Sequence, residues 1–255
     1  MLWKNIFYGP VLSRRLGFSL GVNLLPQKKK VCSFNCIYCE CGLNDNSTQK
    51  EALPTFEDYE QAIYSCLSEN KSRNQRIDHI TFSGNGEPTL HPDFDKIIDC
   101  TILMRDKFYP DTKIAVLTNS TNLHIPKIFD SLKKIDLPLC KLDAGSEETY
   151  QLIDFPVSKK SLDEITNSLV KFEGNIIIQT IFLKGNIDNR AIDNTSEKEL
   201  SLYIDRLKKI NPKKVVIYGV DRTPPFSSII RLSEQELKFI SEFISKFGFN
   251  VEYYA

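Results

Sequence analysis

Four of the chain's seven cysteines lie close together in the stretch VCSFNCIYCECG, residues 31–42. They are Cys32, Cys36, Cys39 and Cys41. Cysteine thiolates bind zinc ions and iron-sulfur clusters. Two interpretations are therefore open. All four thiolates could close one metal site, or three could hold a cluster and leave one coordination position free.

The spacing argues against two common metal sites. A structural zinc site normally has two separated pairs of ligands, whereas Cys39 and Cys41 crowd two ligands together and no second pair lies nearby. Ferredoxin-type clusters use the spacing C-x2-C-x2-C, but three residues separate Cys32 from Cys36. Outside the loop, Cys66, Cys100 and Cys140 are expected to be small core residues.

Composition limits the class of protein. The 255 residues suffice for one α/β domain with a substantial core, and we expect a single domain over residues 1–255. Lys and Arg total 33 and Asp and Glu total 33, which argues mildly against a dedicated nucleic-acid binder. No apolar run approaches the roughly 18 residues that cross a bilayer. The opening MLWKNIFYGP also lacks the extended apolar core of a secretory signal, so we expect no membrane partner and a cytoplasmic protein. An odd cysteine count also fits a reducing compartment.

Strand and helix patterns alternate along the chain. Several of the expected strands are nearly continuous apolar runs, which is typical of parallel strands covered on both faces. The expected strands are 19–25, 77–82, 113–118, 139–143, 176–182, 214–219 and 250–254, and the expected helices are 55–68, 93–107, 125–134, part of 161–172, 197–210 and 233–247. The pattern predicts a parallel sheet wrapped by helices; a closed or partly closed barrel and an open doubly wound sheet both fit it.

Polar segments follow the expected strands. Because the carboxyl ends of parallel strands build the active site of such folds, these segments should share one face. They are residues 32–42, 83–88, 119–122, 143–146 and 221–225. The cysteine loop is thus predicted to lie on the functional face.

Two of these segments resemble the motifs of one family. C-x3-C-x2-C, with Tyr38 before the third cysteine, is similar to the spacing by which the radical S-adenosylmethionine (SAM) superfamily binds its 4Fe-4S cluster. SGNGEPTLHPDF, at 83–94, resembles that superfamily's glycine-glycine-glutamate stretch, which holds the amino end of SAM. The resemblance implies a parallel-stranded partial (β/α)6-type barrel.

The resemblance also implies cofactors and residue roles. Cys32, Cys36 and Cys39 would bind three irons of a 4Fe-4S cluster, and the fourth iron would take the amino and carboxylate groups of SAM. Reductive cleavage of SAM would then generate a 5′-deoxyadenosyl radical that abstracts hydrogen from a substrate. The implied cofactor-binding residues are Tyr38, Gly84, Asn85, Gly86, Glu87, Asn119 and Asp143.

Other polar residues are weaker candidates. For Asn119 and Asp143, turn or helix capping competes with cofactor binding. Lys141 shares a strand face with Asp143 and could pair with it, bind the SAM carboxylate or form a Schiff base. Three arginines could bind an anionic substrate, or could equally have structural roles. They are Arg14, Arg15 and Arg222.

At subgroup level, the stretches YGPVLSRRLGFSLGVN, LTNST, KLDAG and VVIYGVDRTPP make the sequence similar to the branch related to the tRNA wyosine-forming enzymes. Those enzymes carry a second cluster on upstream cysteines, and residues 1–31 contain none, which implies a single-cluster member. The resemblance implies an external low-potential electron donor of the flavodoxin or ferredoxin type. The substrate would be a small molecule or a tRNA nucleoside.

Two other functions remain open. One is an activating enzyme that abstracts hydrogen from a backbone glycine of a partner protein. The other is a noncatalytic iron-sulfur electron-transfer protein whose cysteine loop only resembles the radical motif. Neither the overall reaction nor the fate of SAM follows from the residues.

Overall fold

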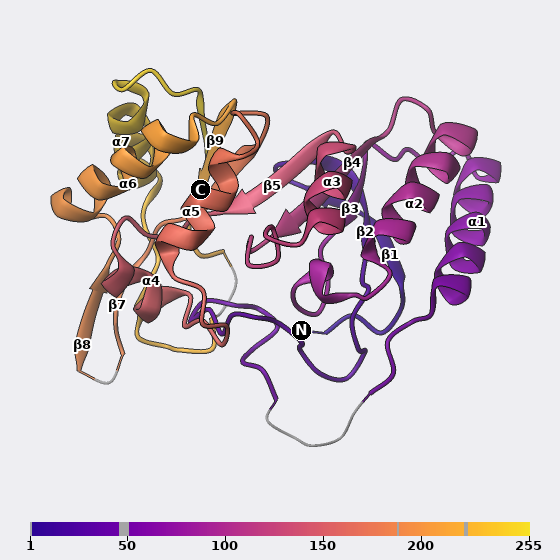
Figure 1. The fold of residues 1–255 in the computed structure, drawn as a ribbon, viewed down its shortest axis with the longest axis horizontal. Helices are drawn as coiled ribbons and strands as arrows, with labels where there is room; N and C mark the ends of the chain where they lie inside the picture. The colour runs from indigo at the N-terminus through magenta and orange to yellow at the C-terminus, as the bar shows by residue number, and fades with distance from the viewer. Residues whose placement is uncertain (1, 46–50, 188, 222–223) are drawn as a thin grey trace. The chain divides into compact units, whose positions relative to one another are not determined.

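The computed structural model describes residues 2–45, 51–187, 189–221 and 224–255 (Figure 1). Its strands are β1 (Phe7–Ser13), β2 (Gly17–Val22), β3 (His79–Phe82), β4 (Lys113–Thr118), β5 (Leu137–Lys141), β6 (Ile177–Ile181), β7 (Lys184–Ile187), β8 (Arg190–Asp193), β9 (Lys214–Tyr218), β10 (Ile229–Ile230) and β11 (Val251–Tyr254). Its helices are α1 (Phe56–Ser72), the 3-10 helix η1 (Pro88–Leu90), α2 (Phe94–Phe108), α3 (Pro126–Lys133), α4 (Glu147–Ile153), α5 (Leu162–Val170), α6 (Glu197–Ile210) and α7 (Glu234–Ser245).

The chain divides into two compact units. Unit 1 comprises Met1–Cys32, Asn44–Thr118 and His124–Pro138, and unit 2 comprises Ser33–Leu43, Asn119–Leu123 and Leu139–Ala255. Neither unit is a continuous stretch of sequence. The expectation of a single domain stays a prediction.

In unit 1, β2, β3 and β4 are parallel neighbours. Their central residues are buried, with Ile80 and Val116 both 0% exposed. Helices α1 and α2 pack on each other, as do α2 and α3 (Figure 1). This agrees with the expected alternation of apolar strands and amphipathic helices.

Strand β1 was not expected, and it pairs with β2 in the antiparallel direction. Its sequence, FYGPVLS, contains a Gly-Pro pair that is typical of a turn. The pairing register shifts between Tyr8 and Val11, at the position of this pair. Proline lacks an N–H to donate, so it is tolerated at such an irregularity on an edge strand.

In unit 2, β5, β6, β9 and β11 are parallel neighbours in that order. All five residues of β6 are buried. An apolar cluster at one end of these strands includes Ile37 of the cysteine loop, Ile153, Ile181 and Leu183. The cluster anchors the cysteine loop by hydrophobic burial.

Two parts of unit 2 were not expected from the sequence. Strands β7, β8 and β10 form a small antiparallel sheet. Helix α4 also went unrecognised, because its 7 residues are too few for a helical period to show. The first expected strand, 19–25, is β2 at Gly17–Val22, and α1 extends to Ser72 beyond the expected end at residue 68.

Ser146 caps α4, and its side chain accepts a hydrogen bond from Thr149 N at 3.1 Å. We expect Ser146→Ala to lower the free energy of unfolding by about 1 kcal/mol, because one N–H of the first turn loses its partner. Urea denaturation measures the change. The control, Lys238→Ala on the exposed side of α7, should change stability by less than about 0.5 kcal/mol. Equal stability of the two variants would contradict this role for the cap.

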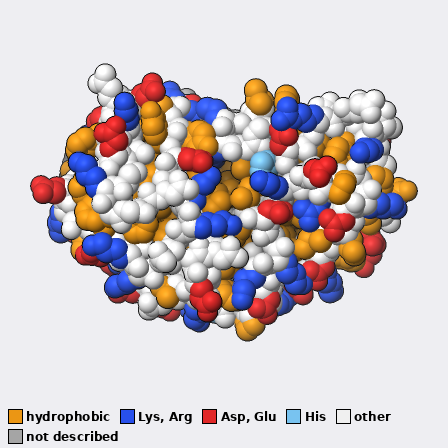
Figure 2. All heavy atoms as spheres, turned by 90° about the horizontal axis from the view of Figure 1, so that it is seen from above, with side chains coloured by type: hydrophobic (Ala, Val, Ile, Leu, Met, Phe, Trp, Pro, Cys, Tyr) orange, Lys and Arg blue, Asp and Glu red, His pale blue; other side chains and the backbone are white. Residues whose placement is uncertain are grey.

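On the face drawn in Figure 2, Lys and Arg side chains are interspersed with Asp and Glu, in keeping with 33 residues of each sign. Within the described residues, each helix is either too short or too polar to cross a membrane.

Candidate functional site

The glycine-rich turn of unit 1 closes onto the segment that leads into the cysteine motif. Val31 and Gly86 form an isolated β-bridge. Val31 N donates to Asn85 O at 2.9 Å, and Glu87 N donates to Val31 O at 3.1 Å. A Cβ on Gly86 would lie 1.8 Å from Val31 O, and Gly86 has a φ of +142°, so only glycine fits here.

Asn85 stabilises the same turn from the inside. Its backbone N donates to Asn23 Oδ1 at 2.9 Å, and its Nδ2 donates to Pro26 O at 2.7 Å. Its Oδ1 also accepts from Trp3 N at 2.8 Å. A Cβ on Gly84 would lie 2.2 Å from Asn23 Oδ1. The two glycines thus allow close packing within the chain, and the side chain of Asn85 is committed to positioning the turn.

The carboxylate of Glu87 is held in place by hydroxyl and amide donors. Glu87 is 3% exposed. Its Oε1 accepts from Thr89 N at 3.1 Å, from Thr89 Oγ1 at 2.6 Å and from Thr118 Oγ1 at the end of β4 at 2.8 Å. The turn after β3 and the end of β4 therefore meet, as the parallel-strand argument predicts.

Cys32 directly follows Val31, the residue that pairs with this turn, and Asn44 holds its backbone. Cys32 N donates to Asn44 Oδ1 at 3.0 Å, and Asn44 Nδ2 donates to Cys32 O at 2.8 Å. This two-way contact fixes the backbone of the first motif cysteine. Sequence reasoning missed Asn44, although it lies only two positions after Gly42, the residue that ends the cysteine-rich stretch.

The rest of the cysteine loop belongs to unit 2 and packs on the end of α4. Ile37 N donates to Ile153 O at 3.0 Å, and Cys39 N donates to Cys36 O at 3.0 Å. Cys36 is 5% exposed, and Cys39 and Cys41 are half-buried. The second and third motif cysteines are thus joined by a hydrogen-bonded turn.

Asn119 contacts the start of this loop. Its Nδ2 donates to Ser33 Oγ at 2.7 Å, and its Oδ1 accepts from Thr121 N at 3.1 Å. Ser33 Oγ also lies 2.7 Å from Thr121 Oγ1. These contacts have the form of the turn-capping role weighed for Asn119, and they fix the residue that follows Cys32.

Beside Cys36 lies a compact polar group. Lys141 Nζ lies 3.1 Å from Asp143 Oδ2, 3.6 Å from Asp154 Oδ1 and 3.4 Å from Cys36 Sγ. Tyr38 OH hydrogen-bonds with both Lys141 Nζ and Asp143 Oδ2. The side chains of Asp143 and Asp154 are 0% and 2% exposed, and that of Lys141 is 17% exposed. We call these five residues the Lys141 network.

The surroundings of the Lys141 network set its charges. Burial by itself lowers the pKa of Lys141, but Asp143, Cys36, Tyr38 and Asp154 together raise that pKa well above its ordinary value. Burial, with a contribution from Asp143, raises the pKa of Tyr38 well above its ordinary value. Burial also raises the pKa of Asp154, against the opposing effect of Lys141. Lys141 is therefore an ammonium ion and Tyr38 a neutral phenol at neutral pH.

The core of unit 2 fixes Asp143 from the other side. Ile181 N at the end of β6 donates to Asp143 Oδ1 at 2.9 Å. Asn194 Nδ2 donates to Asp143 O at 2.9 Å and to Ile181 O at 2.8 Å. Ile181 N thus fixes the carboxylate of Asp143 and Asn194 fixes its backbone carbonyl, so Asp143 is a rigid anchor for Lys141.

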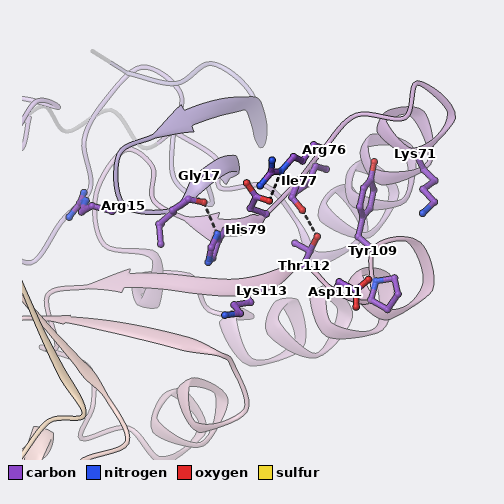
Figure 3. Close-up of a pocket in the computed structure, with 13 residues that line it drawn as sticks. Arg15, Gly17, Lys71, Arg76, Ile77, His79, Tyr109, Asp111, Thr112 and Lys113 are labelled. Atoms are coloured by element: carbon purple, nitrogen blue, oxygen red, sulfur yellow. Dashed lines mark hydrogen bonds and ion pairs between the residues drawn. The ribbon is translucent and has the colours of Figure 1, made fainter. Parts of the chain in front are cut away.

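Two of the three arginines predicted to bind an anionic substrate, Arg14 and Arg15, are not found at the glycine turn. Arg15 lines a cavity of about 590 Å³ together with Gly17, His79 and Lys113 (Figure 3). These three residues are the first residues of β2, β3 and β4. Arg14 lies in the same turn between β1 and β2 and is exposed. This is the opposite end of the strands of unit 1 from the glycine turn, so the structure does not bring these arginines to it. Arg222 lies outside the described residues.

Groups lining this cavity contact one another. Arg76 Nε lies 2.8 Å from Asp78 Oδ1, and His79 Nδ1 donates to Leu16 O at 2.6 Å (Figure 3). Burial lowers the pKa of His79, and Lys113 lowers it further. We assign the cavity no ligand.

Within the part of the chain that the structure describes, no group of three or more His, Cys, Asp or Glu side chains could hold a single metal ion. A 4Fe-4S cluster is a different case, because each thiolate binds a different iron.

Comparison with known proteins gives the family. Residues 29–195 match the family model of the radical SAM superfamily. A UPF0026 protein of Helicobacter pylori (strain J99) is 34% identical over 235 residues, which cover 91% of this chain and 71% of that protein. A protein of Brachyspira hyodysenteriae named GTPase Obg is 34% identical over 239 residues, 92% of this chain, and the chain spans only 32% of its length. A probable GTP 3′,8-cyclase of Methanocella arvoryzae is 31% identical over 183 residues, covering 69% of this chain and 53% of that protein.

Solved structures give the fold. A radical SAM methyltransferase from Sphaerobacter thermophilus is similar with a TM-score of 0.67 and 13% identity, over 92% of this chain and 66% of that one. An archaeal TYW1 is similar with a TM-score of 0.54 and 14% identity, over 89% of this chain and 71% of that one. The predicted fold class is confirmed: α/β, with the mostly parallel partial barrel of the radical SAM type.

This chain belongs to the radical SAM superfamily. The cofactors of that superfamily are a 4Fe-4S cluster and S-adenosylmethionine, and its enzymes need a reductant and a substrate. The chain is thus a radical SAM enzyme.

Proposed function

We propose that Cys32, Cys36 and Cys39 bind the 4Fe-4S cluster and that the turn at Gly84–Glu87 binds SAM. The observation that carries this proposal is the bridge between Val31 and Gly86. It places the residue before the first motif cysteine against the glycine turn, although 55 positions separate them in the sequence. The segment that ends in the first motif cysteine, Cys32, is thereby adjacent to the glycine turn within unit 1.

The donors present fit a cluster. All seven cysteines lie in described residues and carry thiols outside any disulfide bond. The ammonium ion of Lys141 lies 3.4 Å from Cys36 Sγ, and the thiolate is the form of cysteine that binds iron. Three such thiolates leave one iron of a cluster open to the amino and carboxylate groups of SAM. When bound, the cofactors supply reductive cleavage of a carbon-sulfur bond and a 5′-deoxyadenosyl radical that takes hydrogen from a substrate.

The chain's own residues position these groups. Asn44 holds the backbone of Cys32, and Asn85 and Glu87 hold the glycine turn. The side chain of Asn85 and the Oε1 atom of Glu87 are engaged in protein contacts, so they position the turn. Tyr38 and Asp143 were predicted to contact the cofactor, and both lie in the Lys141 network beside Cys36. We propose that they act there by fixing Lys141.

We propose a nucleotide or an RNA nucleoside as the substrate class. The relative named as a GTP 3′,8-cyclase supports the former, and the sequence similarity to the wyosine-forming branch supports the latter. The electron donor is proposed to be of the flavodoxin or ferredoxin type and the location to be the cytoplasm. Because neither compact unit is a continuous stretch of chain, we propose that residues 1–255 form one radical SAM domain.

The test is reductive cleavage of SAM. We expect the iron-reconstituted protein, reduced with dithionite or flavodoxin, to release 5′-deoxyadenosine from SAM, as measured by liquid chromatography. We also expect the electron paramagnetic resonance spectrum of the reduced cluster to change when SAM is added. The control is the same protein with the reductant omitted, which should release none. A cluster spectrum indifferent to SAM, together with no release, would leave only the electron-transfer alternative.

A further inference from the structure

The Lys141 network contains a cation aimed at a proposed cluster ligand. Lys141 Nζ lies 3.4 Å from Cys36 Sγ, which is hydrogen-bond distance for a sulfur acceptor. Lys141 is the last residue of β5, while Cys36 lies in a loop 105 residues away in sequence. The contact is therefore a product of the tertiary fold of unit 2.

Several neighbouring groups hold Lys141 Nζ in its position. Asp143 Oδ2 at 3.1 Å and Asp154 Oδ1 at 3.6 Å attract it, and Tyr38 OH bonds to it. Lys141 Nζ also lies 4.6 Å from the centre of the Tyr38 ring, within the range of a cation-π interaction. Because both carboxylates are buried, removing the ammonium group from between them would leave each without this partner, which is costly.

Asp154 completes the arrangement at the sulfur. In the thiol form, Cys36 Sγ donates to Asp154 Oδ1 at 3.5 Å. In the thiolate form that binds iron, the sulfur has no proton to donate, and it can accept a hydrogen bond from Lys141 Nζ, which lies 3.4 Å away. One cation thus faces both Asp154 and the sulfur.

We propose that Lys141 is a positioning residue that donates a charge-assisted hydrogen bond to the iron-bound sulfur of Cys36 and thereby raises the reduction potential of the cluster. This rests on the proposed function, because it needs Cys36 to be a cluster ligand. The physical reason is that reduction adds negative charge to the cluster and its sulfurs. A fixed cation and N–H donor stabilise the reduced form more than the oxidised form.

This role accounts for a half-buried lysine beside Cys36 without assigning it a step in the reaction. Asp143 and Asp154 hold the ammonium ion, and Tyr38 orients it. Easier reduction matters because an electron must reach the cluster from a donor of limited reducing power. The residue acts through Cys36 and does not need to touch the substrate.

The experiment is a redox titration of the reconstituted protein, followed by electron paramagnetic resonance without SAM. We expect Lys141→Met to lower the midpoint potential. At the wild-type midpoint, the ratio of reduced to oxidised cluster should fall about tenfold, the order expected for losing one charge-assisted hydrogen bond, which is about 59 mV for a one-electron couple. Lys141→Gln, which retains an N–H donor without the charge, should give a smaller shift in the same direction.

The matched control is Lys184→Met. Lys184 also lies in unit 2 and pairs with a carboxylate at 2.8 Å, but its partner, Glu236, belongs to α7 and not to the Lys141 network. This variant should titrate like the wild type. An unchanged potential in Lys141→Met that still holds four irons would overturn the inference and leave the proposed function standing. A wild-type protein that takes up no iron would overturn both.

A second measurement needs no variant. Protein labelled with ¹⁵N at the lysine side chains should show a weak ¹⁵N coupling to the reduced cluster in hyperfine spectroscopy, transmitted through the hydrogen bond to Cys36 Sγ. Absence of this coupling in the loaded wild type would refute the contact, even if Lys141→Met fails to fold.

Discussion

Cys32→Ala, Cys36→Ala and Cys39→Ala are each expected to lose the cluster, whereas Cys41→Ala is expected to keep it. The three motif cysteines are the proposed ligands. A site with only two of these thiolates should bind the cluster much more weakly than a site with three. Cys41 lies two residues beyond Cys39, and the proposed cluster does not use it. Iron and sulfide content and visible absorption after anaerobic reconstitution measure the outcome. We expect less than about a tenth of the wild-type iron in each of the three variants.

The opposite results would be informative. Loss of iron in Cys41→Ala would favour a site that uses all four thiolates, one of the two interpretations left open by the spacing. Full iron in Cys36→Ala would remove Cys36 from the ligand set and, with it, the proposed role of Lys141. Circular dichroism of each variant shows whether a loss of iron reflects misfolding.

Gly86→Ala is expected to be strongly destabilising. The added Cβ would lie 1.8 Å from Val31 O, and the φ of +142° is one that alanine rarely adopts. Both effects oppose the bridge that joins the glycine turn to the cysteine segment. We expect the free energy of unfolding to fall by more than about 2 kcal/mol, because backbone atoms cannot move aside as a side chain can. Urea denaturation of the reconstituted protein measures this.

The matched control is Gly219→Ala. A Cβ on Gly219 would lie 3.4 Å from Leu237 Cδ1, an ordinary van der Waals contact. We expect a change of less than about 1 kcal/mol. If Gly86→Ala retains wild-type stability and SAM still perturbs its cluster spectrum, the bridge is not what assembles the proposed cofactor site.

The sequence alone predicted those features that depend on local patterns. Apolar runs gave the parallel strands, and the cysteine and glycine motifs gave the family. Helix α6 was expected at 197–210 and is found at Glu197–Ile210, with Ser196 as its cap. Such features could be predicted because periodicity and capping act between residues only a few positions apart.

The tertiary structure decided which polar residues act together. Asp154 lies 118 positions from Cys36, and nothing in its neighbourhood, LIDFP, distinguishes it from an exposed acid. Conversely, Arg15 looked like a substrate-binding residue but lies at the amino ends of the strands of unit 1. The strand expected at 19–25 already put Arg15 before its amino end, but the turn between β1 and β2 that holds Arg15 there was not expected, because β1 was missed.

What the sequence determined is therefore the chemistry: three spaced thiols and a glycine turn at strand ends. What only the tertiary structure decided is their environment, above all the ammonium ion of Lys141 beside Cys36 Sγ. The reason is physical. The spacing of the ligands depends on residues close together in the sequence. Burial and charge at a site come from side chains that only the folded chain brings together.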